Sequence, residues 1–74
     1  MVFERLRKLI CEQSGIDEDE VIMEASFEDD LGFDDLDMIE LIMEAEEEFD
    51  IEIGEGSDFN TVGEMVQYIQ GQLE

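Results

Sequence analysis

The hydrophobic and acidic residues of the segment 35–49 are spaced as in a helix whose surface is divided into separate faces. At about 100° per residue, the apolar residues on one arc form a stripe that should face a core. This stripe consists of Met38, Leu41, Ile42, Ala45 and Phe49. An acidic arc lies opposite and consists of Asp37, Glu40, Glu44, Glu47 and Glu48. The pattern therefore predicts a helix that buries one side and leaves the other in water.

A second apolar row runs along one flank of this predicted helix, between the core stripe and the acidic arc. We call it the flank row: Leu36, Ile39 and Met43, at the i, i+3, i+7 spacing that aligns side chains. Two interpretations are open. The flank row either widens the core stripe, or forms a docking surface in which apolar contacts supply area and nearby carboxylates supply steering and register.

The residues before this helix match a helix start. Asp34 is a good N-cap, because its carboxylate can accept hydrogen bonds from the unpaired backbone N–H groups that follow. Asp35 and Asp37 place negative charge in the first turn, where the helix dipole favours it. Gly32 permits the chain to turn into the helix. A local structural role therefore stands beside any function assigned to Asp35.

Two further segments, 3–14 and 61–73, show helical periodicity. Gly15 is placed as the C-terminal stop of the first, and Thr61 with Glu64 matches a capping box at the start of the last. Their apolar positions are Phe3, Leu6, Leu9 and Ile10, and then Val62, Met65, Val66, Ile69 and Leu73. The predicted fold class is all-α, a small bundle of three to four helices in one domain, residues 1–74.

The connections between these helices are predicted to be mostly irregular. Residues 16–34 form a long loop with room for a short helical turn at 17–20, and Val21, Phe27 and Leu31 should anchor this loop to the core. A loop of this length is usually functional or pinned in a compact domain. Residues 50–53 alternate like a strand but have no obvious partner, so no strand is predicted. Residues 57–60 have room for one helical turn, the short fourth element.

The net charge of −21 restricts the partners that the protein can bind. All three basic residues, Arg5, Arg7 and Lys8, lie in the first helix, where they either contact acidic groups elsewhere or form a solvated face. Nucleic acid is excluded as a partner because phosphate contacts need Lys and Arg, and anionic membranes are disfavoured. The field should instead attract proteins with basic patches. Self-repulsion should also make the stability of the fold depend on salt.

Composition gives little support for catalysis or metal binding. There is no His, and Cys11 is the only cysteine; it should be an incidental exposed thiol that forms no internal disulfide. No segment has the ligand spacing of a calcium-binding loop, so no dedicated metal site is predicted despite 24 acidic residues. No apolar run approaches the roughly 18 residues that span a bilayer, and the N-terminus has no signal-peptide core. No membrane insertion and a cytoplasmic location are therefore expected.

The run from Ala25 to Asp37, Ala-Ser-Phe-Glu-Asp-Asp-Leu-Gly-Phe-Asp-Asp-Leu-Asp, resembles the loop and second-helix start of type II acyl carrier proteins. The resemblance spans nearly the whole chain, in order and at the right distances. Its other pieces are Glu4-Arg5, Glu12-Gln13-x-Gly15, Glu40-Leu41, Glu46-Glu47-Glu48-Phe49-Asp50 and Thr61-Val62-Gly63. It implies a helical bundle with a long first loop, and a non-enzymatic carrier of acyl chains in fatty-acid, or related acyl or polyketide, biosynthesis.

The position that bears the cofactor in this family departs from the family pattern. There a 4′-phosphopantetheine arm is attached to the serine of an Asp-Ser-Leu motif, and the matching triplet here is Asp34-Asp35-Leu36. Because a carboxylate cannot form the serine phosphodiester, the resemblance implies that the arm is absent at Asp35. The serines of the chain, none of which lies in an Asp-Ser-Leu setting, are Ser14, Ser26 and Ser57.

Three explanations for Asp35 are open: an engineered serine-to-aspartate form of a true carrier, a natural carrier-like paralogue that binds partners without an arm, or a mis-recorded residue. Glu44 and Ala45 also differ from the small and the larger apolar residues common at these positions in the family. These two differences should alter the core volume beneath the second helix.

The resemblance also implies a docking surface, because the second helix of the family docks on basic patches of the enzymes it serves. By residue match this surface consists of Asp34, Leu36, Asp37, Ile39, Glu40, Met43, Glu46, Glu47 and Ile53. The implied partners are enzymes of acyl-chain synthesis or transfer, bound by a monomeric chain. The rival hypothesis is an acidic regulatory or mimic protein that sequesters a basic partner by charge alone.

Overall fold

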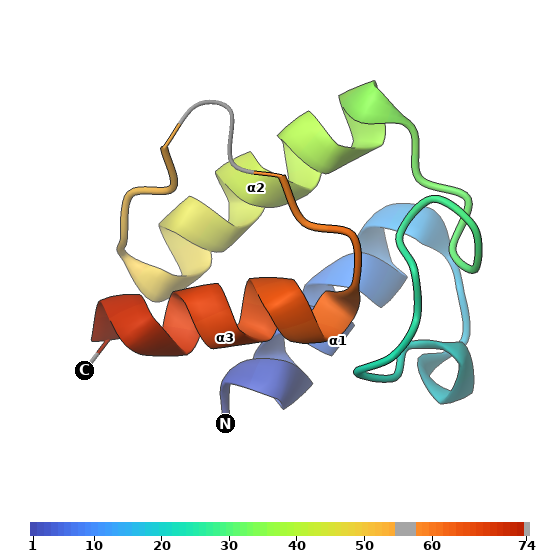
Figure 1. Cartoon of the computed structure of the whole chain (residues 1–74), viewed down its shortest axis with the longest axis horizontal. Coiled ribbons are helices and arrows are strands. Elements are labelled where there is room, and N and C mark those ends of the chain that lie inside the picture. The colour runs from blue at the N-terminus through green and yellow to red at the C-terminus, as the bar shows by residue number, and fades with distance from the viewer. Residues whose placement is uncertain (55–57, 74) are drawn as a thin grey trace.

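A computed structural model describes residues 1–54 and 58–73 of the chain. Three α-helices account for most of it: α1 (Val2–Ser14), α2 (Asp35–Phe49) and α3 (Val62–Leu73). Helix α1 packs against both α2 and α3 (Figure 1). The described residues contain no strand, only one isolated bridge between Ser26 and Thr61. The predicted all-α bundle is confirmed, and the alternating run 50–53 forms no strand.

Helix α1 buries one face and ends where the sequence predicted. Leu6 and Ile10 are fully buried. Gly15 adopts a left-handed conformation with φ of 78°, which glycine does without steric cost, and its N–H donates to the carbonyl of Cys11 at 2.8 Å. Cys11 itself is half-buried and packs against the core, so the expectation of an exposed thiol was wrong. The helical projection could not show the contacts that α1 makes with α2, α3 and the turn Glu18–Glu20.

Arg5 links α1 to the end of α2. Its Nη2 donates to the Glu48 carboxylate and to the Glu48 carbonyl, both at 2.8 Å. Its guanidinium also lies 4.6 Å from the centre of the Phe49 ring, within the range of a cation–π contact. One of the three basic residues therefore contacts the acidic part of the molecule, as one of the two sequence interpretations proposed.

Helix α2 begins with a reciprocal cap. The Asp34 carboxylate accepts from the N–H of Asp37 at 2.9 Å, and the Asp37 carboxylate accepts from the N–H of Asp34 at 3.1 Å. The helix ends at Asp50, whose φ is 53° and whose N–H donates to the carbonyl of Glu46. Aspartate is one of the few residues besides glycine that visits this left-handed region. Both ends of α2 are therefore set by local sequence.

The long connection between α1 and α2 is pinned to the start of α3. The N–H of Phe27 donates to the carbonyl of Asn60 at 2.9 Å, that of Val62 to Ala25 at 3.0 Å, and that of Gly63 to Met23 at 2.8 Å. Its buried side chains are Val21, Ala25, Phe27, Leu31 and Phe33. Three of these anchors were predicted, and Ala25 and Phe33 were not.

Two short features of the connections also bear on the predictions. Residues Glu18–Glu20 form a single 3-10 turn, which confirms the possible turn at 17–20. The turn expected at 57–60 falls partly outside the described residues, and its described part, 58–60, forms no helix.

Helix α3 has the Thr61 half of the predicted capping box and nearly all of the predicted core stripe. The Thr61 hydroxyl accepts from the N–H of Glu64 at 3.2 Å, while the Glu64 carboxylate reaches back to the N–H of Asn60 at 3.4 Å. Val62, Met65, Val66 and Ile69 are buried. Leu73 is exposed, so its assignment to the core stripe was wrong. It lies in the last turn of α3, at the edge of the molecule beyond the end of α1 (Figure 1). No described helix has the length and apolar character needed to cross a membrane.

Candidate functional site

The flank row of α2 is exposed to solvent. The exposed fractions are 63% for Leu36, 54% for Ile39 and 59% for Met43. On the other side of the helix, Leu41, Ala45 and Phe49 are buried, and Met38 and Ile42 are partly buried against them. The core stripe is thus confirmed without the flank row, and the interpretation that the flank row widens the core was wrong. An apolar line on a solvent-facing helix surface needs another explanation.

Three of the five acidic residues of the predicted docking surface are engaged in local structure. Asp34 and Asp37 form the N-terminal cap of α2. Glu46 accepts the N–H of Ile53 at 2.8 Å and so fixes the segment after the helix. Glu40 and Glu47 are exposed, and neither makes a hydrogen bond or an ion pair with the described residues. These two carboxylates are therefore available to a partner.

Ile53 does not lie with the exposed residues of the predicted docking surface. Its exposed fraction is 6%. The hydrogen bond from its N–H to Glu46 folds the chain back toward α2, and its side chain packs into the core cluster. The assignment of Ile53 as a surface contact does not agree with this burial.

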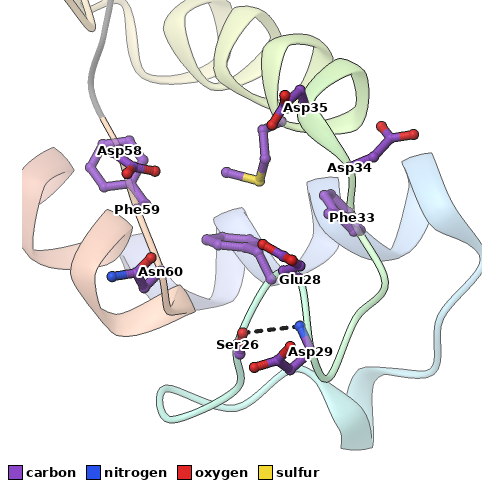
Figure 2. A pocket seen from close by; sticks show the side chains of 11 residues that line it. Ser26, Glu28, Asp29, Phe33, Asp34, Asp35, Asp58, Phe59 and Asn60 are labelled. Atoms are coloured by element: carbon purple, nitrogen blue, oxygen red, sulfur yellow. Dashed lines mark hydrogen bonds between the residues drawn. The ribbon is translucent and has the colours of Figure 1, made fainter.

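A hollow of about 290 Å³ lies between the first turn of α2, the long loop and the segment before α3. Figure 2 shows Ser26 and Glu28 of the loop, Phe59 from the segment before α3, and Asp35 on α2 around it. The Ser26 hydroxyl accepts from the N–H of Asp29 at 3.1 Å. The sequence did not indicate this hollow, because its residues come from three segments that meet only in the fold.

A larger and mainly apolar groove of about 800 Å³ begins at the same place and follows α2 toward its C-terminus. Met38, Ile39, Ile42, Met43, Ile53 and Phe59 line its apolar part. Asp35 borders both this groove and the smaller hollow. Phe59 was missed by sequence reasoning; its only signal was an aromatic residue within a polar loop.

Asp35 is the one carboxylate of the Asp34-Asp35-Leu36-Asp37 turn that the cap does not use. Its side chain is exposed and makes no hydrogen bond or ion pair with the described part of the chain. Asp34 and Asp37, by contrast, are held in the capping box. One end of α2 therefore presents the free carboxylate of Asp35 and the first residue of the flank row, Leu36. The hollow and the apolar groove also meet there.

Metal chemistry finds no support in the geometry of the described residues. Nowhere in residues 1–54 and 58–73 do three or more carboxylate or cysteine side chains converge so that they could hold a metal ion. The free carboxylates of α2 are instead spread along its solvent-facing surface.

Comparison with known proteins shows a family and a relative that this chain is similar to. The family described as "Phosphopantetheine attachment site" matches residues 4–69. An acyl carrier protein from Clostridium acetobutylicum is 51% identical over 76 aligned positions, which cover 100% of this chain and 99% of the relative.

Proposed function

Because the chain belongs to the acyl carrier protein family, we propose that it serves fatty-acid or related acyl biosynthesis by presenting α2 to partner enzymes. Members of this family are carriers and not enzymes. The observation that carries the proposal is the exposed flank row, Leu36, Ile39 and Met43, on a helix whose other apolar residues are buried or partly buried against the core. The partners are enzymes of acyl-chain synthesis or transfer that carry basic patches.

The physics of such a contact divides between area and charge. Burying the flank row against a partner removes apolar surface from water, which supplies affinity. Glu40 and Glu47, exposed on the same helix, supply charge complementarity, which raises the association rate and fixes the register more than it adds affinity. The net charge of −21 extends this attraction around the whole molecule.

The residues at the attachment position do not fit the family cofactor. Phosphopantetheine attachment needs a hydroxyl that becomes a phosphate ester, and Asp35 offers a carboxylate. Ser26 borders the same hollow but lies in the loop, where its oxygen accepts the N–H of Asp29. Ser14 donates to the carbonyl of Ile10 at 2.6 Å, and Ser57 lies outside the described residues. The proposed protein is therefore a carrier-type scaffold without an arm at Asp35.

Intact mass tests this proposal directly. The chain and an Asp35→Ser version are incubated with coenzyme A and a broad-specificity phosphopantetheinyl transferase. We expect only the serine version to gain one phosphopantetheine, because only it presents a hydroxyl on a carrier-type surface. If neither chain gains mass, the modifying enzyme does not recognise this surface, and the rival hypothesis of an acidic mimic is favoured. A gain on the chain with Asp35 would show that another residue accepts the arm.

The rate of that modification separates docking from charge mimicry. In the Asp35→Ser background, Ile39→Ala should lower kcat/KM by about tenfold, the loss expected for a contact residue near an interface centre. Ile22→Ala is the matched control, because Ile22 is a 49% exposed isoleucine in the first loop, away from α2. Equal rates for the two alanine variants, with a uniform loss on added salt, would support sequestration by charge alone.

The proposal also takes residues 1–74 as one domain that acts as a monomer in the cytoplasm. A monomer leaves the flank row open to partner enzymes. Sedimentation equilibrium should give one chain per particle at micromolar concentration. A dimer that dissociates on Met43→Glu would mean that the flank row binds a second copy of the chain.

A further inference from the structure

Aspartate and serine at position 35 differ in charge as well as in their ability to bear the family cofactor. A serine hydroxyl is neutral, whereas the phosphodiester that joins a serine to an arm carries one negative charge at neutral pH. A carboxylate at the same position also carries one negative charge. An aspartate there therefore reproduces the charge that modification would add, without the arm or its thiol.

The local structure leaves this charge free to be recognised. The carboxylates of Asp34 and Asp37 hold each other's backbone N–H groups in the cap, with bonds of 2.9 and 3.1 Å. Asp35 has no such bond within the described residues and is exposed. It borders the hollow (Figure 2) and also the apolar groove. It directly precedes Leu36, the first residue of the flank row. A cation that contacts Asp35 can therefore belong to a partner that covers the flank row.

The position of Asp35 in the helix favours a negative charge. Asp35 is the first residue of α2, where the helix dipole stabilises a negative side chain. The two cap bonds join Asp34 and Asp37 and do not involve the Asp35 side chain. A serine and an aspartate at position 35 therefore differ in charge and chemistry without a difference in these two bonds.

We propose that this chain is a permanent charge mimic of an arm-bearing carrier and that it competes with arm-bearing carriers for the enzymes that act on them. The inference rests on the proposed function and names the partner more closely. The partner is an enzyme whose docking patch places a Lys or Arg where it meets the phosphate of an attached arm. Because Asp35 bears no thiol, the bound chain delivers no acyl group and acts as an inhibitor.

Competition kinetics test this inference. An acyltransferase that loads arm-bearing carriers is assayed with a modified carrier as substrate, in the presence of this chain. We expect competitive inhibition, which raises KM for the modified carrier and leaves kcat unchanged. Asp35→Asn and unmodified Asp35→Ser should each raise the inhibition constant by about fivefold to tenfold, because a charged acceptor is lost. Asp35→Glu should remain close to the original chain.

Two matched variants separate this inference from its premise. Glu12→Gln removes the same charge from an exposed position on α1 and should leave inhibition unchanged. Ile39→Ala removes part of the flank row and should weaken inhibition whichever residue occupies position 35. Circular dichroism checks that each variant keeps its helices.

The outcomes are distinct. If Asp35→Asn inhibits as well as the original chain while Ile39→Ala does not, the enzyme does not recognise the charge of Asp35. The inference then fails and the proposed function stands. If Glu12→Gln weakens inhibition as much as Asp35→Asn does, the overall charge accounts for binding, and the inference and the proposed function both fail. Absence of inhibition by every version, including Asp35→Ser, contradicts the docking surface itself.

Discussion

At the scale of single residues, the first turn of α2 shows what a sequence can and cannot reveal. The sequence identified Asp34 as an N-cap, because capping depends on residues two or three positions apart. It did not reveal that Asp37 would return a bond to Asp34, so that Asp35 alone remains free. Ile53 gives the opposite lesson. The family resemblance placed it on the docking surface, whereas in the structure its N–H donates to Glu46 and its side chain is buried.

Cys11 allows a prediction at this scale. Burial raises the pKa of its thiol above the ordinary value of 9.0; the carboxylates of Glu18 and Asp17 add to this, and Arg7 opposes it. Because the thiolate is the reactive form, the folded protein should react with iodoacetamide at pH 8 more slowly than the protein unfolded in urea. The midpoint of its pH–rate profile should lie above 9.0. Mass spectrometry of the alkylated chain gives both rates, with Cys11→Ser as the unlabelled control. Equal rates in the folded and unfolded states would mean that the thiol is solvent-exposed.

At the scale of elements, the helices were predictable and the first loop was predictable only in part. Periodicity placed helices at 3–14 and from about 35 to 49, and the structure has Val2–Ser14 and Asp35–Phe49. Within helices each residue's neighbours follow from a fixed geometry. In the long loop, Ala25 and Phe33 are buried by contacts with distant segments, and no period in the sequence reports such contacts. The hollow beside Asp35 was hidden for the same reason.

Two glycines of α3 provide a matched test of how the loop is pinned. A Cβ at Gly63 would lie 3.0 Å from the carbonyl oxygen of Met23, the same oxygen that accepts the Gly63 N–H. Gly63→Ala should therefore lower the free energy of unfolding by about 1 kcal/mol, since strain outweighs the gain in helix propensity. A Cβ at Gly71 meets nothing within 4 Å, and Gly71→Ala should raise the free energy of unfolding by up to about 0.5 kcal/mol. Urea unfolding measures both. If Gly63→Ala is as stable as Gly71→Ala, the contact between the loop and α3 is loose.

At the scale of the whole molecule, charge and size act together. The principal extents are 28 × 24 × 19 Å, and the sequence carries 24 acidic and three basic residues. The Arg5–Glu48 pair neutralises one acid at the junction of α1 and α2. A surface this acidic favours encounter with basic partners, while the repulsion among its carboxylates opposes the folded state. Function and stability therefore respond to salt in opposite directions.

Stability should rise with ionic strength. At 10 mM salt the screening length is about 30 Å, which exceeds the molecule's longest extent, so nearly all carboxylates repel one another; at 150 mM it is about 8 Å. We expect the melting temperature to rise by at least about 5 °C between these conditions, which corresponds to roughly 1 kcal/mol for a domain of this size. Millimolar magnesium chloride should produce a similar rise. Scanning calorimetry of the original chain, beside a triple variant with Glu40→Gln, Glu44→Gln and Glu47→Gln, checks the cause. Because the variant removes three exposed carboxylates of α2, its melting temperature should start higher in low salt and rise less. A melting temperature that stays flat for the original chain would show that repulsion among the carboxylates does not limit this fold.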